Sequence, residues 1–102
     1  MIKITENPDG SWAKHEYDEN GNQVKVEESN GSWRKYKYNK NGNKVKSKCS
    51  NGFWTKSKYD KNGNLLKYED LDGFWMKHEY DEKGNRVKYE DSDGNKEKII
   101  IE

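Results

Sequence analysis

The sequence predicts an all-β fold, an antiparallel up-and-down meander of hairpins made from four copies of a 21-residue unit. The first observation is an unbroken repeat, in which Gly73, Trp75 and Tyr80 have counterparts at every shift of 21 residues. The second is an alternation of apolar and polar residues with period two, which is typical of half-buried strands. The third is a glycine-containing turn signal between the alternating segments. Each copy is therefore one supersecondary unit that buries its apolar face beside a neighbouring copy.

The repeat divides the chain into successive units. Half a unit covers residues 1–7, full repeats cover 8–29, 30–50, 51–71 and 72–92, and half a unit covers 93–102. We expect two strands in each full repeat and a single domain, because 102 residues is the size of one domain. In the first half-unit, residues 2–6 resemble residues 24–28, with Pro8 as one additional residue in the following turn. The pattern leaves open whether the sheet is open, coiled or closed into a barrel.

The turn inside each repeat contains Asn20-Gly21 or its counterpart. This dipeptide predicts a two-residue type I′ turn. Such a turn places Tyr17 opposite Val24 and His15 opposite Val26, and it brings oppositely charged residues together on the other face. Cross-strand pairs of these kinds stabilise an antiparallel sheet, so the predicted register is consistent with the side chains.

The turn between repeats has a different sequence, Ser29-Asn30-Gly31 in the first instance. It predicts a three-residue loop in which the glycine adopts a left-handed conformation and forms a bulge. This loop places Glu27 opposite Trp33 and Val26 opposite Arg34. The two turn types together keep each side chain on the same face from copy to copy.

Alternation distributes the side chains over two faces of the sheet. We expect the tyrosine face to form a thin core, since hydrophobic residues make up only 28% of the chain. The tyrosine face comprises Tyr17, Tyr36, Tyr38, Tyr59, Tyr68, Tyr80, Tyr89, Phe53, Phe74, Val24, Val45, Leu66, Val87, Ile99 and Ile101. The tryptophan face carries Trp12, Trp33, Trp54 and Trp75 among lysines and glutamates.

The composition argues against several classes of protein. A charged fraction of 38% is typical of disordered chains, but the periodic aromatic residues, 13% of the total, favour a folded sheet. The single cysteine, Cys49, leaves no partner for an intramolecular disulfide, so we expect a cytoplasmic protein. Residues 1–6 contain no apolar signal core, and no segment approaches the length needed to span a membrane.

Charge is strongly segregated along the chain. Residues 34–67 contain eleven basic residues and one acidic residue, for a net charge of +10. Residues 1–33 carry a net charge of −4 and residues 68–102 a net charge of −5. In the predicted register, Lys37 then faces Lys46, Lys35 faces Lys48, and Lys58 faces Lys67. Like charges in directly opposed positions lower stability, so folding alone does not favour this arrangement.

The basic residues beside two tryptophans are the candidate binding site. It comprises Trp33, Lys35, Lys37, Lys46, Lys48, Trp54, Lys56 and Lys58. Lysine beside tryptophan suits an acidic protein surface, and it also suits a nucleic acid whose bases stack on the rings. A third interpretation is a solvated face whose charges balance over the whole molecule or support self-association.

The four tryptophans recur on every second strand. They either lie over neighbouring lysine stems and shield the sheet, or form a stacking platform for a sugar or a base. His15 and His78 stand at equivalent positions three repeats apart, which argues against a shared metal site. No nucleophile–base motif appears, so we expect no enzymatic activity, no metal and no cofactor.

The turn motif resembles that of a known repeat family. It occurs as Tyr17-Asp18-Glu19-Asn20-Gly21-Asn22, Tyr59-Asp60-Lys61-Asn62-Gly63-Asn64 and Tyr80-Asp81-Glu82-Lys83-Gly84-Asn85, with Asn39 replacing aspartate in the second copy. These segments resemble the YD repeat of Rhs proteins, insecticidal toxin complexes and teneurins, in which many copies wind into a hollow shell. The chain is also similar to choline-binding cell-wall repeats and to short arrays in small proteins of phages and mobile elements.

The sequence thus favours a non-enzymatic binding protein that engages an acidic protein surface, for example as a phage-type inhibitor acting in a bacterial cytoplasm. The alternatives are nucleic-acid binding through the same residues and carbohydrate binding on the tryptophans. The thin core and the isoleucine-rich segment 98–102 leave a face and an edge to cover. We expect either closure of residues 2–6 against 98–102 or a homodimer through the tyrosine face or the 98–102 edge.

Overall fold

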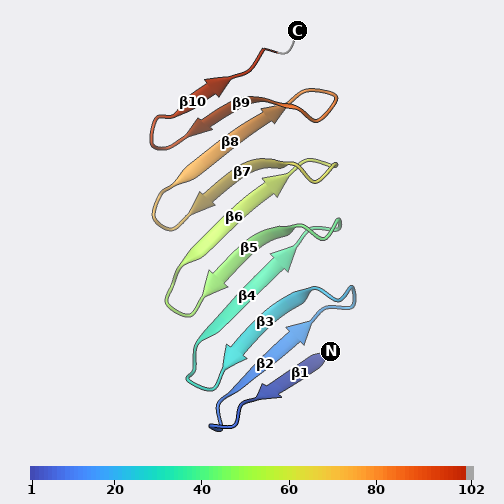
Figure 1. Ribbon diagram of the computed structural model, residues 1–102, viewed down its shortest axis with the longest axis vertical. Coiled ribbons are helices and arrows are strands. Elements are labelled where there is room, and N and C mark those ends of the chain that lie inside the picture. The colour runs from blue at the N-terminus through green and yellow to red at the C-terminus, as the bar shows by residue number, and fades with distance from the viewer. Residues whose placement is uncertain (101–102) are drawn as a thin grey trace. The chain divides into compact units, whose positions relative to one another are not determined.

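The computed structural model of the protein describes residues 1–100. The chain forms ten β-strands joined by tight turns (Figure 1). The strands are β1 (Ile2–Glu6), β2 (Trp12–Tyr17), β3 (Gln23–Glu28), β4 (Trp33–Tyr38), β5 (Lys44–Cys49), β6 (Trp54–Tyr59), β7 (Leu65–Asp70), β8 (Trp75–Tyr80), β9 (Arg86–Asp91) and β10 (Lys96–Lys98). This arrangement confirms the predicted all-β hairpin meander. The described residues contain no helix long and apolar enough to cross a membrane.

The strands belong to two compact units, Met1–Trp54 and Thr55–Glu102. Within the first unit, β1 to β5 follow one another in chain order, and each strand pairs antiparallel with the next. Within the second unit, β6 to β10 do the same. Over the described residues, β1 pairs only with β2 and β10 pairs only with β9, so the sheet is open at both strands.

The turn inside each repeat is not the predicted type I′ turn. Gly21 has φ of 85°, but no non-glycine residue in the described chain has positive φ, whereas type I′ requires it at two positions. The Gly21 N–H donates to the carbonyl of Asp18, and the Asp18 N–H donates to the carbonyl of Asn22 at 2.9 Å. These bonds define a three-residue loop. The Asp18 carboxylate favours this loop because it accepts the N–H groups of Asn20 and Asn22, both at 2.9 Å.

The extra loop residue changes the register next to the turn. Tyr17 pairs with Gln23 instead of the predicted Val24, and a bulge separates the Tyr17 pair from its neighbour. Beyond the bulge, the predicted register is confirmed, with His15 opposite Val26. The bulge absorbs the additional residue, so the faces of the two strands remain aligned away from the turn.

The turn between repeats has the predicted three-residue form. The Gly31 N–H donates to the carbonyl of Glu28, and Glu27 lies opposite Trp33. The first turn of the chain is of the same kind, because the Gly10 N–H donates to the carbonyl of Asn7. Pro8 is therefore an ordinary loop residue and not an additional one, and the predicted alignment of the first half-unit was wrong.

The corrected alignment moves the isoleucines of β1 to the tryptophan face. Ile2 pairs with Glu16 and Ile4 pairs with Lys14, so both isoleucines share a face with charged side chains. Their exposed fractions are 56% and 59%. Moving one residue along a strand exchanges its two faces, which explains why a one-residue error in alignment reversed the expectation.

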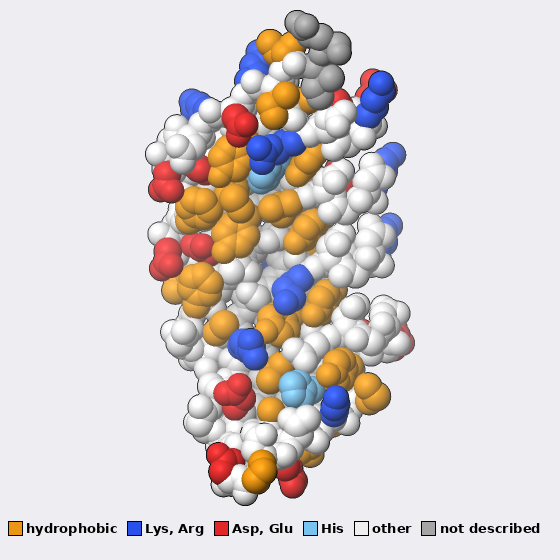
Figure 2. Space-filling model, in the orientation of Figure 1, with side chains coloured by type: hydrophobic (Ala, Val, Ile, Leu, Met, Phe, Trp, Pro, Cys, Tyr) orange, Lys and Arg blue, Asp and Glu red, His pale blue; other side chains and the backbone are white. Residues whose placement is uncertain are grey.

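The tyrosine face forms a half-buried surface in each unit. Val26 is the one hydrophobic side chain among the described residues that is classed as buried, with 3% exposed, whereas Tyr59 and Tyr80 are half-buried. Hydrophobic side chains gather along the strands on the face seen in Figure 2. A single layer of strands cannot enclose a deep interior, so stability comes from many partly covered aromatic rings. The predicted contribution of Ile101 falls outside the described residues.

Two of the tyrosines that precede the turns inside the repeats have a specific hydrogen-bonding role. The Tyr38 hydroxyl donates to the carbonyl of Gln23 at 2.6 Å, and the Tyr80 hydroxyl donates to the carbonyl of Leu65 at 2.7 Å. Gln23 and Leu65 are the bulge residues of the preceding repeat. A bulge interrupts the regular pairing of backbone groups, so each tyrosine satisfies a carbonyl that the sheet leaves available.

Candidate partner-binding surface

Five of the eight predicted site residues lie together on the tryptophan face of β4 and β5. Lys35 pairs with Lys48 and Lys37 pairs with Lys46, as predicted, and all four side chains are exposed. Lys46 lies two residues from Lys48 on the same strand, so the four ammonium groups project from one face. Trp33 lies at the start of β4 on this face.

The position of Trp33 is fixed by its backbone and by a neighbouring cation. The Trp33 N–H donates to Ser50 Oγ at 3.1 Å, and the Ser50 N–H donates to the Trp33 carbonyl at 2.9 Å. The Lys35 ammonium lies 4.9 Å from the centroid of the indole ring. The ring is half-buried and already engaged in a cation–π contact. Shielding of the sheet by lysine and tryptophan is therefore present at this site.

Lys25, which is not among the predicted site residues, extends the group of lysines by one strand. Lys25 pairs with Lys35 across β3 and β4, so a row of three lysines crosses β3, β4 and β5. The Lys25 ammonium lies 3.5 Å from a Glu27 carboxylate oxygen. We refer to Lys25, Lys35, Lys37, Lys46 and Lys48 as the first lysine patch. The predicted turn between repeats already implied the pairing of Lys25 with Lys35.

The remaining predicted residues, Trp54, Lys56 and Lys58, lie on β6. Lys58 pairs with Lys67, as predicted, while Lys56 pairs with Glu69. Lys67 also pairs with Lys77, a residue that the sequence analysis did not assign to the site. The Lys77 ammonium lies 5.1 Å from the centroid of Trp75, which repeats the contact seen at Trp33. Trp54, at the start of β6, is half-buried.

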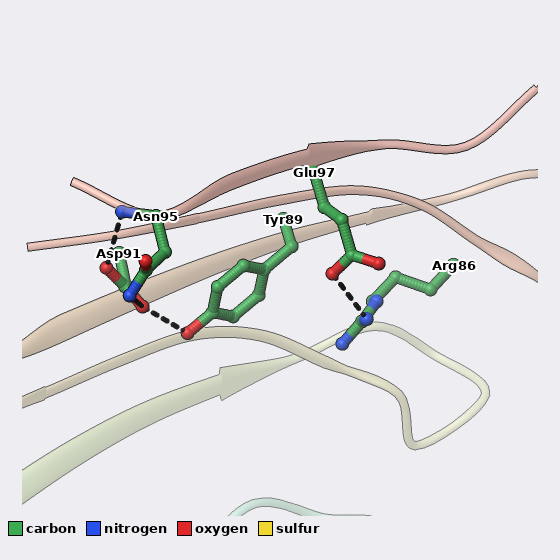
Figure 3. A network of polar contacts seen from close by, with 5 residues as sticks. All are labelled: Arg86, Tyr89, Asp91, Asn95 and Glu97. Atoms are coloured by element: carbon green, nitrogen blue, oxygen red, sulfur yellow. Dashed lines mark hydrogen bonds and ion pairs between the residues drawn. The ribbon is translucent and has the colours of Figure 1, made fainter. Parts of the chain in front are cut away.

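The buried carboxylate of Asp91 is a candidate proton donor or acceptor, but both of its oxygens already accept hydrogen bonds from neighbouring groups. Asp91 is 6% exposed, and Figure 3 shows the groups around it. It accepts the Tyr89 hydroxyl at 2.6 Å, the Asn95 side-chain N–H at 3.1 Å, and the backbone N–H groups of Asp93 and Asn95. The hydrogen bond from Tyr89, followed by those from Asn95, lowers the pKa of Asp91. The carboxylate therefore stays ionised and organises the turn after β9.

The histidines lie on the tyrosine face, in different surroundings. His15 Nδ1 lies 2.9 Å from Gln23 Oε1. Both ring nitrogens of His78 are buried without a hydrogen-bond partner, and its ring stacks against Tyr80 at a centroid distance of 6.2 Å. Burial, with a smaller contribution from Arg86, lowers the pKa of His78. Among the described residues, no group of three or more His, Cys, Asp or Glu side chains is arranged to hold a metal ion.

A shallow groove of about 320 Å³ lies in the first unit, beside Val26, Arg34 and Cys49. A second groove of about 320 Å³ lies in the second unit, lined by Lys88, Tyr89, Glu90, Lys96, Glu97 and Lys98.

Comparison with known protein families gives no matching family model, and comparison with curated proteins gives no match either. The functional interpretation therefore depends on the chemistry of the surface.

Proposed function

We propose that this chain is a non-enzymatic binding protein that engages an acidic surface of a protein partner through the first lysine patch and Trp33. The opposed lysines of β4 and β5 carry the proposal. At the equivalent positions of the first repeat, lysine faces glutamate: Lys14 with Glu27, and Lys25 with Glu16. Because opposed like charges lower stability, the lysine pairs are a cost to the fold that an acidic partner would offset.

The arrangement supports attraction over a distance followed by a close contact. Five cationic side chains on three adjacent strands favour encounter with a negatively charged surface, at a rate that depends on ionic strength. Trp33 adds an aromatic group beside the patch, and tryptophan is among the residues that most often contribute strongly to protein interfaces. A small inhibitor of the kind that phages direct against host proteins would use such a surface.

The contact between Lys35 and Trp33 favours a protein partner over stacked bases or sugars. A base or sugar ring that stacked on Trp33 would have to compete with the Lys35 ammonium, which lies 4.9 Å from the ring centroid. A carboxylate can bind Lys35 from the solvent side without displacing it from the ring. The same reasoning applies to Lys77 and Trp75 in the second unit.

The test is affinity capture from nuclease-treated and untreated lysate, with two matched variants. The patch variant replaces Lys35, Lys37, Lys46 and Lys48 by glutamine. The control variant replaces Lys14, Lys77, Lys88 and Lys96 by glutamine, which removes the same charge from the tryptophan face elsewhere. We expect wild type and the control to retain the same protein partner, the patch variant to lose it, and the captured complex to dissociate as salt is raised.

Two results would contradict the proposal. If nuclease treatment abolishes capture, the patch binds nucleic acid. If the patch variant retains every partner of the wild type, the lysines are a solvated face. Circular dichroism of both variants separates loss of binding from loss of the fold.

A further inference from the structure

Exposed hydrophobic side chains are concentrated on and beside two strands, β1 and β10. Five of the eight large hydrophobic side chains that are exposed among the described residues belong there: Met1, Ile2, Ile4, Ile99 and Ile100. Ile4 is 59% exposed and Ile100 is 77% exposed. Covering these side chains would remove apolar surface from water and so stabilise a protein whose hydrophobic content is low.

Ile4 and Ile100 replace charged residues at defined positions of the repeat. The counterparts of Ile4 in the full repeats are Lys25, Lys46, Lys67 and Lys88. The counterparts of Ile100 are Glu16, Lys37, Lys58 and Glu79. Within the first and fourth repeats these counterparts are cross-strand partners, since Glu16 pairs with Lys25 and Glu79 pairs with Lys88.

The same register would bring the two isoleucines together. When the pairing of the first repeat is transferred by the 21-residue period, Ile100 falls opposite Ile4 and Lys98 falls opposite Glu6. The second pair has the same charges as Lys14 and Glu27 in the first repeat. One register therefore matches apolar with apolar and cation with anion.

The backbone of both strands is oriented for this pairing. In the first unit, the Asn7 N–H donates to the Ser11 carbonyl and the Tyr17 N–H donates to the Met1 carbonyl. The backbone groups of residues 1, 3, 5 and 7 therefore face β2, and those of Ile4 and Glu6 face outward. In the second unit, the Ile99 N–H donates to the Val87 carbonyl at 2.9 Å, so those of Lys98 and Ile100 face outward. The proposed pairs are those whose N–H and C=O groups are available on both strands.

We propose that β10 of one chain pairs with β1 of a second copy of this chain, in the register that sets Ile100 opposite Ile4 and Lys98 opposite Glu6. In the described residues each of these strands has a neighbour on one side only, so a second copy supplies the missing neighbour. The interface is heterologous, because two different edges meet. It uses none of the side chains of the first lysine patch.

The experiment is analytical ultracentrifugation of the full chain over a concentration series. The wild type should show a weight-average mass that rises with concentration above the 12.1 kDa of one chain. The variant Ile4→Lys/Ile100→Lys should weaken association at least tenfold. The variant Ile4→Lys/Ile100→Glu, which restores the charge pair of the first repeat, should recover most of it. Leu71→Lys, at an exposed apolar side chain in a turn, is the control that should associate as the wild type does.

Three results would overturn the proposal. One is a wild type that stays monomeric at every concentration, and another is a double-lysine variant that associates as strongly as the wild type. The third is a monomer in which hydrogen exchange shows protected amides at both Ile4 and Ile100, which would mean that the two strands pair within one chain. Circular dichroism of the variants verifies that each retains the sheet.

Discussion

At the scale of single residues, His15 and His78 occupy equivalent positions but differ in their hydrogen bonding: His15 has a side-chain partner and His78 has none. The two histidines are equivalent in the repeat, but the position that provides Gln23 as a partner for His15 holds Arg86 near His78. Arg86 contacts the ring of Tyr89 at 5.3 Å and pairs with Glu97 at 3.3 Å. An arginine can only donate hydrogen bonds, and its charge opposes protonation of the nearby imidazole.

The first residue-scale prediction concerns the pH dependence of stability. Because the folded-state pKa of His78 lies below its ordinary value, the unfolded chain binds more protons as the pH falls below about 6.5. The free energy of unfolding should therefore decrease on acidification through the range in which the free imidazole titrates. Arg86→Gln should reduce this decrease, because glutamine offers His78 an acceptor and removes a positive charge. Urea denaturation at a series of pH values measures the effect.

The reverse substitution is the matched control. Gln23→Arg removes the side-chain oxygen that lies 2.9 Å from His15 Nδ1 and places a positive charge at the position equivalent to Arg86, so this variant should be less stable than the wild type. If Arg86→Gln leaves the pH dependence unchanged, neither the charge of Arg86 nor the missing acceptor contributes to it, and burial of the His78 ring alone accounts for the lowered pKa. The Arg86–Glu97 pair is exposed and should contribute less than about 1 kcal/mol to the comparison.

At the scale of strands and turns, the recurring tyrosine joins one repeat to the next. The three-residue loop places a bulge at the start of the second strand, and the bulge leaves a carbonyl available at Gln23. The hydroxyl of Tyr38, from the following repeat, donates to that carbonyl. The same contact recurs between Tyr80 and Leu65. Tyrosine thus supplies both aromatic area and a polar link, which phenylalanine could not do.

The prediction at this scale is that Tyr38→Phe lowers the free energy of unfolding by about 1–2 kcal/mol, because the half-buried carbonyl of Gln23 loses its donor. Tyr36→Phe on the same strand is the control, since the Tyr36 hydroxyl has no hydrogen bond in the described part of the chain. Its effect should stay below about 0.5 kcal/mol. Chemical denaturation of the two variants side by side provides the measurement. Equal losses would show that the hydroxyl of Tyr38 contributes nothing specific.

At the scale of the whole molecule, charge is distributed unevenly although the repeats are alike. Residues 34–67 carry a net charge of +10 between two segments of opposite sign. The structure shows the consequence within each unit, where Lys37 faces Lys46 and Lys58 faces Lys67. Repeat proteins add their stability repeat by repeat, so a local repulsion of this kind lowers the total.

The prediction at this scale is that Lys37→Glu stabilises the protein by about 0.2–1 kcal/mol, because it converts the pair with Lys46 into the Glu/Lys pair found in the first repeat. The same substitution should weaken capture of the acidic partner. Glu16→Lys, which creates a lysine pair in the first repeat, should lower stability by a similar amount. Both differences should shrink in high salt, and thermal or urea denaturation at two salt concentrations tests this. A less stable Lys37→Glu protein would contradict the account.

The strands, the two faces and most of the cross-strand pairing follow from local patterns in the amino-acid sequence. Turn signals such as Gly31 and the alternation of side chains through β4 depend only on residues that are close together in the sequence. For that reason, the predicted cross-strand pairs Trp33 with Glu27 and Lys35 with Lys48 are present in the structure. The members of the candidate site on β4 and β5 could be named before their geometry was known.

The turn type, the bulge and the partners of the buried polar groups become apparent in the folded chain. Asp18 captures two backbone N–H groups and thereby selects a three-residue loop over the type I′ turn that Asn20-Gly21 favours in isolation. The bond from Tyr38 to Gln23 and the unpartnered nitrogens of His78 then follow from which side chains meet across strands. Several donors compete for each acceptor in these contacts. The spacing of residues along the chain does not show which donor forms the hydrogen bond.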